Sequence, residues 1–200
     1  ITTNAGSIYE VDHNGVVTPL ASTGEDTEGL DVAPLGGNLG AFNGDLIVAS
    51  EGTGRIRALD PISHSLTVFA TVAGGEELSV VPLNLGASGN PVEGMYGADY
   101  SFDVVKADAS QFTAFKGDVI VTGEFTHRVS DIHFDGTTFV VTDVGHFPHQ
   151  PEDGIFVTAA IITGGGSVPE PGTLLLLGTA LAGLAGFRYR RRTLTRSSGK

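Results

Sequence analysis

The chain has 200 residues, 29 of them glycine and none of them cysteine, and its formal net charge is −12. The lack of cysteine excludes a disulfide framework and thiol chemistry. The negative charge excludes nucleic acid as an expected partner, because a phosphate backbone attracts basic surfaces and repels acidic ones. The length suits one domain with an appended segment.

The charges are unevenly distributed along the chain. Residues 168–200 hold six of the eleven basic residues and a single acidic one, which leaves five basic and 22 acidic residues in 1–167. Turn pairs such as Asn14-Gly15 recur in the acidic part, and they favour short strands joined by tight turns over long helices. The sequence therefore predicts an all-β body over residues 1–163.

A weak internal repeat organises this body. The stretch Phe42–Ile56 recurs as Phe115–Val129, with Phe, Gly-Asp, Ile-Val, Glu and Arg in register. Each copy reads as a turn, a buried strand, a second turn and an alternating strand. The following strand recurs too, because Ser7–Ala21 parallels both Arg55–Ala70 and Arg128–Thr142. Repeated meanders of this kind are typical of β-propeller blades.

The repeat spacing is irregular, 48 and then 73 residues, which indicates an insertion around Met95–Thr113. About three blades can be recognised, whereas a closed propeller needs about four to eight. We therefore expect a partial, N-terminally truncated β-propeller, with residues upstream of Ile1 completing the fold. The alternative fold is a β-sandwich built from the same strands.

The Gly-Asp-Leu-Ile-Val segment at 44–48, with the Gly-x-Gly-Arg-Ile-x-x-Leu-Asp segment at 52–60, resembles NHL-repeat and gluconolactonase-like propellers. In the gluconolactonase-like family, the glutamate of a Glu-Gly-Pro element is one ligand of a divalent metal in the central channel. Glu28 and Glu93 are each followed by glycine, but not by proline, and resemble this element. The resemblance makes both candidate metal ligands, while their recurrence also fits a repeat-defining turn.

A second candidate metal group reads Asp143-x-x-His146-x-x-His149. Carboxylate and imidazole groups bind zinc and similar ions. Pro148 prevents a regular helix, so the spacing alone does not place both rings on one face. Solvated loop histidines are the alternative. We expect no cofactor, with a divalent cation such as calcium left open.

Other acidic residues of the body are predicted to have structural roles. Glu76-Glu77 follows two glycines and is predicted to form a solvated acidic turn, with calcium binding as the alternative. Glu51 and Glu124 recur in register in the two copies of the repeat, which indicates a structural role. The arginines that follow them in each copy are expected to pair with nearby acids.

The C-terminal segment has a different composition. We predict a flexible linker with a Pro-Glu-Pro element at 164–171, a transmembrane helix with an arginine cluster at 172–192 and a cytoplasmic tail at 193–200. The fifteen residues Thr173–Phe187 carry no charge and span about 22 Å as a helix, where a comfortable membrane span takes about 20 residues. Arginines after such a helix stay in the cytoplasm, so the body lies across the membrane from them.

This C-terminal segment resembles the PEP-CTERM sorting signal, which consists of Val-Pro-Glu-Pro, a short hydrophobic helix and an arginine cluster in this order. This resemblance implies cleavage near Pro-Glu-Pro by an exosortase, a membrane transpeptidase-like enzyme of exopolysaccharide-producing Gram-negative bacteria. It also implies export across the inner membrane, transient anchoring there with a cytoplasmic C-terminus, and a final place at the cell surface or outside the cell. The matching motif residues are Val168, Pro169, Glu170, Pro171, Arg190, Arg191 and Arg192.

We therefore expect an exported surface or matrix protein with a non-catalytic propeller body that binds a ligand or acts as a scaffold. Its expected partners are an exosortase and the membrane before processing, with exopolysaccharide as a candidate partner. The sequence contains no Gly-x-Ser-x-Gly elbow and no phosphate-binding loop. The alternatives are a metal-dependent hydrolase of the lactonase or esterase type on the same scaffold, and a structural spacer without a specific ligand.

Overall fold

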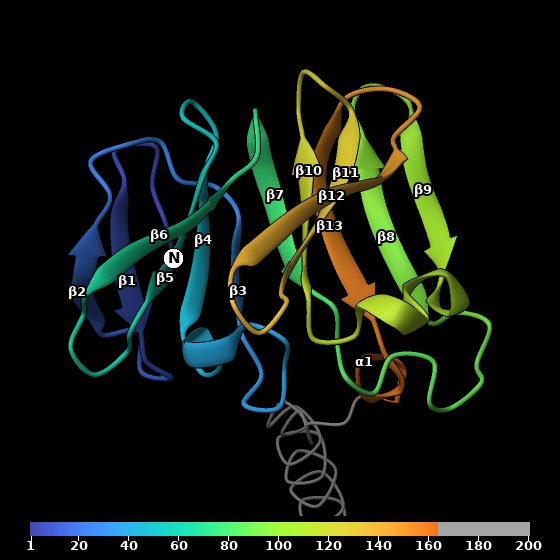
Figure 1. The fold of residues 1–200 in the computed structure, drawn as a ribbon, viewed down its shortest axis with the longest axis horizontal. Coiled ribbons are helices and arrows are strands. Elements are labelled where there is room, and N and C mark those ends of the chain that lie inside the picture. Colours follow the sequence, from blue (N-terminus) through green and yellow to red (C-terminus); the bar gives the residue numbers. More distant parts are fainter. Residues whose placement is uncertain (164–200) are drawn as a thin grey trace, which may run out of the picture. The chain divides into compact units, whose positions relative to one another are not determined.

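The structure, a computed structural model, describes residues 1–163, which form a body whose regular secondary structure is almost entirely β-strand (Figure 1). The all-β prediction is therefore confirmed. Three short helices accompany the strands: η1 (Gly40–Phe42), η2 (Ala109–Phe115) and α1 (Ala159–Ile162). The strands are β1 (Ser7–Val11), β2 (Val17–Ser22), β3 (Leu30–Val32), β4 (Leu46–Ser50), β5 (Arg55–Leu59), β6 (Leu66–Thr71), β7 (Gly75–Val80), β8 (Gly94–Asp99), β9 (Asp103–Asp108), β10 (Val119–Gly123), β11 (Arg128–Phe134), β12 (Phe139–His146) and β13 (Pro151–Val157).

These strands form four antiparallel sheets. Sheet 1 contains β1 and β2, and sheet 2 has the order β3-β4-β5-β6. Sheet 3 has the order β7-β10-β11-β12, and sheet 4 has the order β13-β8-β9. Figure 1 shows the sheets following one another, from blue sheet 1 on the left to the green strands of sheet 4 on the right. The sequence repeat corresponds to β4 and β5 in sheet 2 and to β10 and β11 in sheet 3.

The predicted insertion is confirmed, because β8, β9 and η2 lie between β7 and β10, which are neighbours in sheet 3. The inserted strand β8 pairs with β13, with Tyr96 opposite Ile155 and Met95 opposite Phe156. Sheet 4 therefore combines the insertion with the last strand of the body.

Three apolar cores lie between the four sheets. In β10, Val119 and Val121 belong to the core between sheets 2 and 3, and Ile120 belongs to the core between sheets 3 and 4. A strand buried on both faces reads as a continuous apolar run, which explains the Val-Ile-Val sequence. Ile8, Val48 and Leu59 form the core between sheets 1 and 2.

The edge strand β7 of sheet 3 packs against two other edge strands, β3 of sheet 2 and β13 of sheet 4. Just before β3, a Cβ atom on Gly29 would lie 2.4 Å from the carbonyl oxygen of Glu76 in β7. In β13, a Cβ atom on Gly154 would lie 3.2 Å from the carboxyl carbon of Glu77. The first of these glycines is thus required by close backbone approach, and the three edge strands border one cleft.

Among residues 1–163, no helix is both long enough and apolar enough to cross a membrane. The predicted linker at 164–171, the predicted transmembrane helix at 172–192 and the predicted tail at 193–200 lie outside the described residues.

Candidate functional site

The cleft bordered by β3, β7 and β13 has a volume of about 850 Å³ and is strongly acidic. Its lining, as far as the described residues form it, includes no Lys, Arg or His side chain. A concave surface of one charge sign concentrates ions of the opposite sign, so this acidic cleft attracts cations. The carboxylate residues that line it are Glu28, Asp31, Glu76, Glu77, Glu152 and Asp153.

Some of these carboxylates also serve the fold. Asp31 accepts a hydrogen bond from the backbone amide of Val80 at 2.7 Å, which ties β3 to β7. Glu77 is buried and accepts a hydrogen bond from the hydroxyl of Ser79 through one oxygen, while its Oε2 atom has no partner within residues 1–163. Burial raises the pKa of Glu77 to about 7.

Glu76 is the most unusual carboxylate of the acidic cleft. The residue is only 6% exposed, and its buried Oε2 atom has no hydrogen-bond partner among the described residues. Burial, followed by the charges of Glu124, Glu152, Glu28 and Glu51, raises its pKa to about 8. A carboxyl group with this pKa is largely protonated at neutral pH.

Glu28 also belongs to a second arrangement, the acidic trio Asp26, Glu28 and Glu51. One carboxylate oxygen from each of these residues lies within 4.8 Å of the others. Burial and the charges of Asp26 and Glu51 raise the pKa of Glu28. Carboxylate oxygens at this spacing are ligands for a hard cation such as calcium. The structure thus places the predicted ligand Glu28 in a group that can hold a metal ion.

Glu124 adds to the same negative field. It follows β10 as Glu51 follows β4, so these recurring glutamates stand at equivalent strand ends. Burial and the neighbouring Glu51 raise the pKa of Glu124 to about 7. The side-chain amide of Gln150 donates hydrogen bonds to Glu124 and, at 2.9 Å, to Glu152. The repeat thus gathers acids beside the acidic cleft as well as shaping the sheets.

Glu93, the other predicted glutamate ligand, lies elsewhere. It is 1% exposed and lines a separate cavity with Asp108 and Lys116. Its carboxylate accepts hydrogen bonds from the Ser88 hydroxyl and, at 3.0 Å, from the backbone amide of Ala159. The hydrogen bond from Ser88 contributes most to lowering its pKa. Glu93 therefore connects the segment before β8 to the start of α1.

The structure does not bring Asp143, His146 and His149 together. Asp143 forms an ion pair with Arg128 at 2.9 Å, as expected for an arginine of the repeat. His149 contacts the carboxylate of Asp99 at 2.8 Å, and His146 is exposed at the end of β12. Two groups within residues 1–163 have metal-binding geometry, and neither contains any of these three predicted ligands.

Several site residues were misjudged from the sequence. The prediction of a solvated turn at Glu76-Glu77 is wrong, because both residues lie in the fully buried strand β7. The β-branched residues Val80 and Val81, shortly after the glutamates, indicate a strand. A strand that ends there could have been extended back to include Glu76 and Glu77. The second metal-binding group, Asp118, Asp131 and His133, was not recognised as a group. Its signal is the Asp-x-His spacing, which puts both side chains on one face of a strand.

A family model of the PEP-CTERM protein-sorting motif matches residues 167–192. These residues are a PEP-CTERM sorting motif. The motif supports exosortase-dependent sorting and implies export to the cell surface or beyond. It contains all the predicted motif residues, from Val168 to Arg192, and these lie outside the part of the chain that the structure describes.

The chain is similar to a solved structure, that of an auxiliary nutrient-binding protein from Bacteroides thetaiotaomicron VPI-5482. The two share 15% sequence identity with a TM-score of 0.33. The match covers 76% of this chain and 47% of the other, so this chain spans about half the length of that protein. No curated protein matches the chain.

Proposed function

We propose that this chain is an exported protein of the cell surface or extracellular matrix, and that its body is a non-catalytic, cation-dependent binding or scaffold module. The PEP-CTERM motif at 167–192 supports the export step. In this proposal the helix at 172–192 anchors the chain in the inner membrane with its C-terminus in the cytoplasm. An exosortase then cleaves near Pro169-Glu170-Pro171.

The arrangement of the sheets supports a propeller-like body. Four sheets follow one another with a separate core between each pair, which is more layers than the two of a β-sandwich. Sheets 2 and 3 have the same four-stranded meander order, as propeller blades do. Their inner edges face one acidic cleft, as blades face a central channel.

The single observation that carries the binding proposal is the buried Oε2 atom of Glu76 in the acidic cleft, which has no hydrogen-bond partner among the described residues. A buried carboxylate oxygen without a partner is costly unless a proton or cation satisfies it. The neighbouring acidic trio of Asp26, Glu28 and Glu51 offers three carboxylate oxygens within 4.8 Å of one another, and calcium binds such oxygens. Calcium is the ion that we propose for this cleft.

A bound cation also gives the body a means of contacting exopolysaccharide. The acidic cleft repels an anionic polymer when it is empty, because like charges face each other. Calcium coordinated by Glu28 and its neighbours retains positions for oxygen ligands from a second molecule, such as polymer carboxylates or hydroxyls. We therefore propose that the association with exopolysaccharide depends on calcium.

Calcium titration of the 200-residue chain, followed by calorimetry, tests the binding step. Glu28→Gln is expected to weaken calcium binding about tenfold or more, because one charged ligand is lost. Asp103→Asn, at an exposed carboxylate of β9, is the matched control and should leave the affinity unchanged. Equal affinity in wild type and Glu28→Gln would overturn the calcium proposal.

The sorting step needs a separate test in cells of a host with an exosortase. Replacing Arg190, Arg191 and Arg192 together by alanine is expected to prevent processing and surface delivery, while the β-rich circular dichroism of the purified chain is retained. Normal processing of this variant would contradict the sorting proposal.

The alternative is a metal-dependent hydrolase of the lactonase type, and the position of Glu28 beside the acidic cleft is the observation that favours it. A panel of lactones and esters, assayed with calcium, magnesium, manganese or zinc, separates the two proposals. Turnover that is lost in Glu28→Gln would favour the hydrolase, and no turnover with any ion would favour the binding module.

A further inference from the structure

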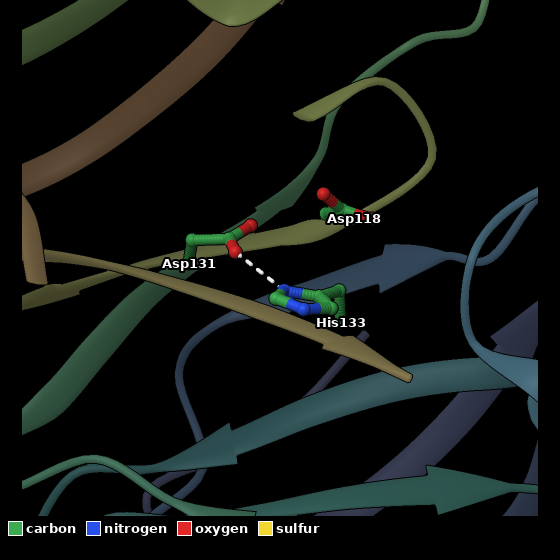
Figure 2. A group of neighbouring side chains, drawn as sticks. All are labelled: Asp118, Asp131 and His133. Atoms are coloured by element: carbon green, nitrogen blue, oxygen red, sulfur yellow. Dashed lines mark hydrogen bonds and ion pairs between the residues drawn. The ribbon is translucent and has the colours of Figure 1, made fainter. Parts of the chain in front are cut away.

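A second cluster of possible ligands lies in sheet 3, formed by Asp118, Asp131 and His133. Asp131 and His133 are two residues apart on β11, so both point to the same face of the strand. Asp118 directly precedes β10, and continuing the β10–β11 register by one position places it opposite His133. One ligand atom from each residue lies within 4.8 Å of the others. Figure 2 shows the three side chains lying next to one another.

The three side chains are held in place by the surrounding structure. The amide of Asn38 donates hydrogen bonds to Asp118 at 2.8 Å and to the carbonyl oxygen of Lys116 at 2.9 Å. The backbone of Asn38 also forms hydrogen bonds with Gly117, just before β10, and with Phe134 of β11, so the loop after β3 is fixed to the ends of both strands that carry the cluster. The cluster is therefore built before any ligand arrives.

One carboxylate oxygen of Asp131, Oδ1, accepts no hydrogen bond from the described residues and is available to bind a cation. The residue is 2% exposed, and its Oδ2 atom lies 2.9 Å from Nδ1 of His133. Its Oδ1 atom is buried and has no hydrogen-bond partner among residues 1–163. In Figure 2 one oxygen lies on the dashed line to His133, and the other is directed toward Asp118. A protonated histidine satisfies the first oxygen. The second oxygen is satisfied by a proton shared with the Asp118 carboxyl group or by a cation that replaces this proton.

The equivalent positions of sheet 2 show that the repeat does not require this cluster. Asp45, Ala58 and Asp60 stand there, so the central carboxylate is replaced by a methyl group. Asp60 is used as a turn cap, accepting hydrogen bonds from the backbone amides of Ile62 and Ser63 at 2.7 and 2.8 Å. The Asp-Asp-His set is thus a property of sheet 3 and not of the blade architecture.

We propose that Asp118, Asp131 and His133 bind a divalent transition-metal ion, zinc in the first place. Two carboxylates and one imidazole form a mixed oxygen and nitrogen set, which suits zinc better than calcium. A zinc ion accepts ligands from Asp131 Oδ1, from Asp118 and from a ring nitrogen of His133, and the buried oxygen is thereby satisfied.

The zinc site has one open coordination position. The ligands line a cavity of about 300 Å³ together with Asn38, Ala114, Phe115 and Phe134. With three protein ligands, tetrahedral zinc keeps a fourth position for water or for an oxygen of another molecule. The site thus differs from the acidic cleft in its ligand set and in its preferred ion.

Zinc titration of the 200-residue chain by calorimetry tests this proposal, with the side-chain ¹⁵N shifts of His133 recorded by NMR. The expected result is one zinc ion bound in wild type and a shift of one His133 ring nitrogen. Loss of a second-sphere partner alone weakens metal binding about 10- to 100-fold, so Asp131→Asn is expected to weaken it by at least about 100-fold. Asparagine keeps the shape and an acceptor for His133, so the fold should survive, which circular dichroism checks.

Two control variants separate this site from other metal ligands. His146→Ala removes an exposed histidine of the same sheet. Glu28→Gln removes the residue that belongs to both the acidic cleft and the acidic trio. Both are expected to keep zinc binding at the Asp118, Asp131 and His133 site. Zinc affinity that is unchanged in Asp131→Asn, or a folded wild-type chain that binds no zinc while His133 titrates as an ion-paired histidinium, overturns the proposal.

Discussion

Arg57, a buried arginine of β5, binds side chains on both sides of it at one end of sheet 2. Arg57 is 5% exposed, and its guanidinium group donates hydrogen bonds to the Ser50 hydroxyl at 2.7 Å and to Glu25 at 2.8 Å. Arg55 pairs with the same glutamate from a more exposed position. Because a buried charge without its counterion is strongly destabilising, Glu25 determines whether Arg57 can remain in place.

Glu25→Gln is therefore expected to lower the melting temperature at neutral pH. The hydrogen bond from Arg57 contributes most to holding the pKa of Glu25 at about 2, below its usual 4.5. A lowered pKa means that the stabilisation is present above about pH 4.5 and is lost as the pH falls toward 2. Melting curves of wild type and variant between pH 7 and 2 should converge in acid.

The matched control for this residue is Glu10→Gln, at an exposed glutamate of β1. It should melt close to wild type at neutral pH. A difference between wild type and Glu25→Gln that stays constant down to pH 2 would show that the ion pair is not its cause.

Among the structural elements, the contact between the start of β3 and β7 leaves no room for a side chain at Gly29. Gly29→Ala is expected to destabilise the body by about 1–3 kcal/mol, the usual cost of overpacking, because its Cβ atom would lie 2.4 Å from the Glu76 carbonyl oxygen and 2.7 Å from the Leu78 amide. Chemical denaturation measures this change. Gly52→Ala is the control, since a Cβ atom at Gly52 meets no atom within 4 Å; equal stability of the two variants would contradict the steric argument.

Local patterns predicted the elements better than they predicted the site. The Gly117-Asp118 turn and the Val-Ile-Val run identified β10 and its entry from the sequence, because both signals lie within a few residues. The pairing of β8 with β13 joins residues such as Tyr96 and Ile155, and no local signal specifies so distant a partner. Glu76 could not be recognised as a cleft residue for the same reason, since its burial depends on β3, β10 and β13 together.

At the scale of the whole molecule, the acids of the cleft act on stability as a group. When folding raises the pKa of an acid, the unfolded chain loses the proton at a lower pH than the folded chain does. The pKa of Glu76 is about 8 and that of Glu77 about 7, against a usual value of 4.5. Their favourable contribution is therefore complete below about pH 4.5 and is lost as the pH rises through 7 to 8.

In the presence of a metal chelator, the melting temperature is consequently expected to fall between pH 5 and 8, the range bracketed by these pKa values. Four neighbouring glutamates make this fall steeper, because the charge of each one opposes the ionisation of Glu76. They are Glu28, Glu51, Glu124 and Glu152. Saturating calcium should remove most of the decline, since the cation takes the place of the protons. Glu76→Gln should flatten the profile measured in chelator, whereas Asp103→Asn should not. A wild-type melting temperature that rises from pH 5 to 8 in chelator would mean that the acids of the cleft are ionised and solvated, with no need of a cation.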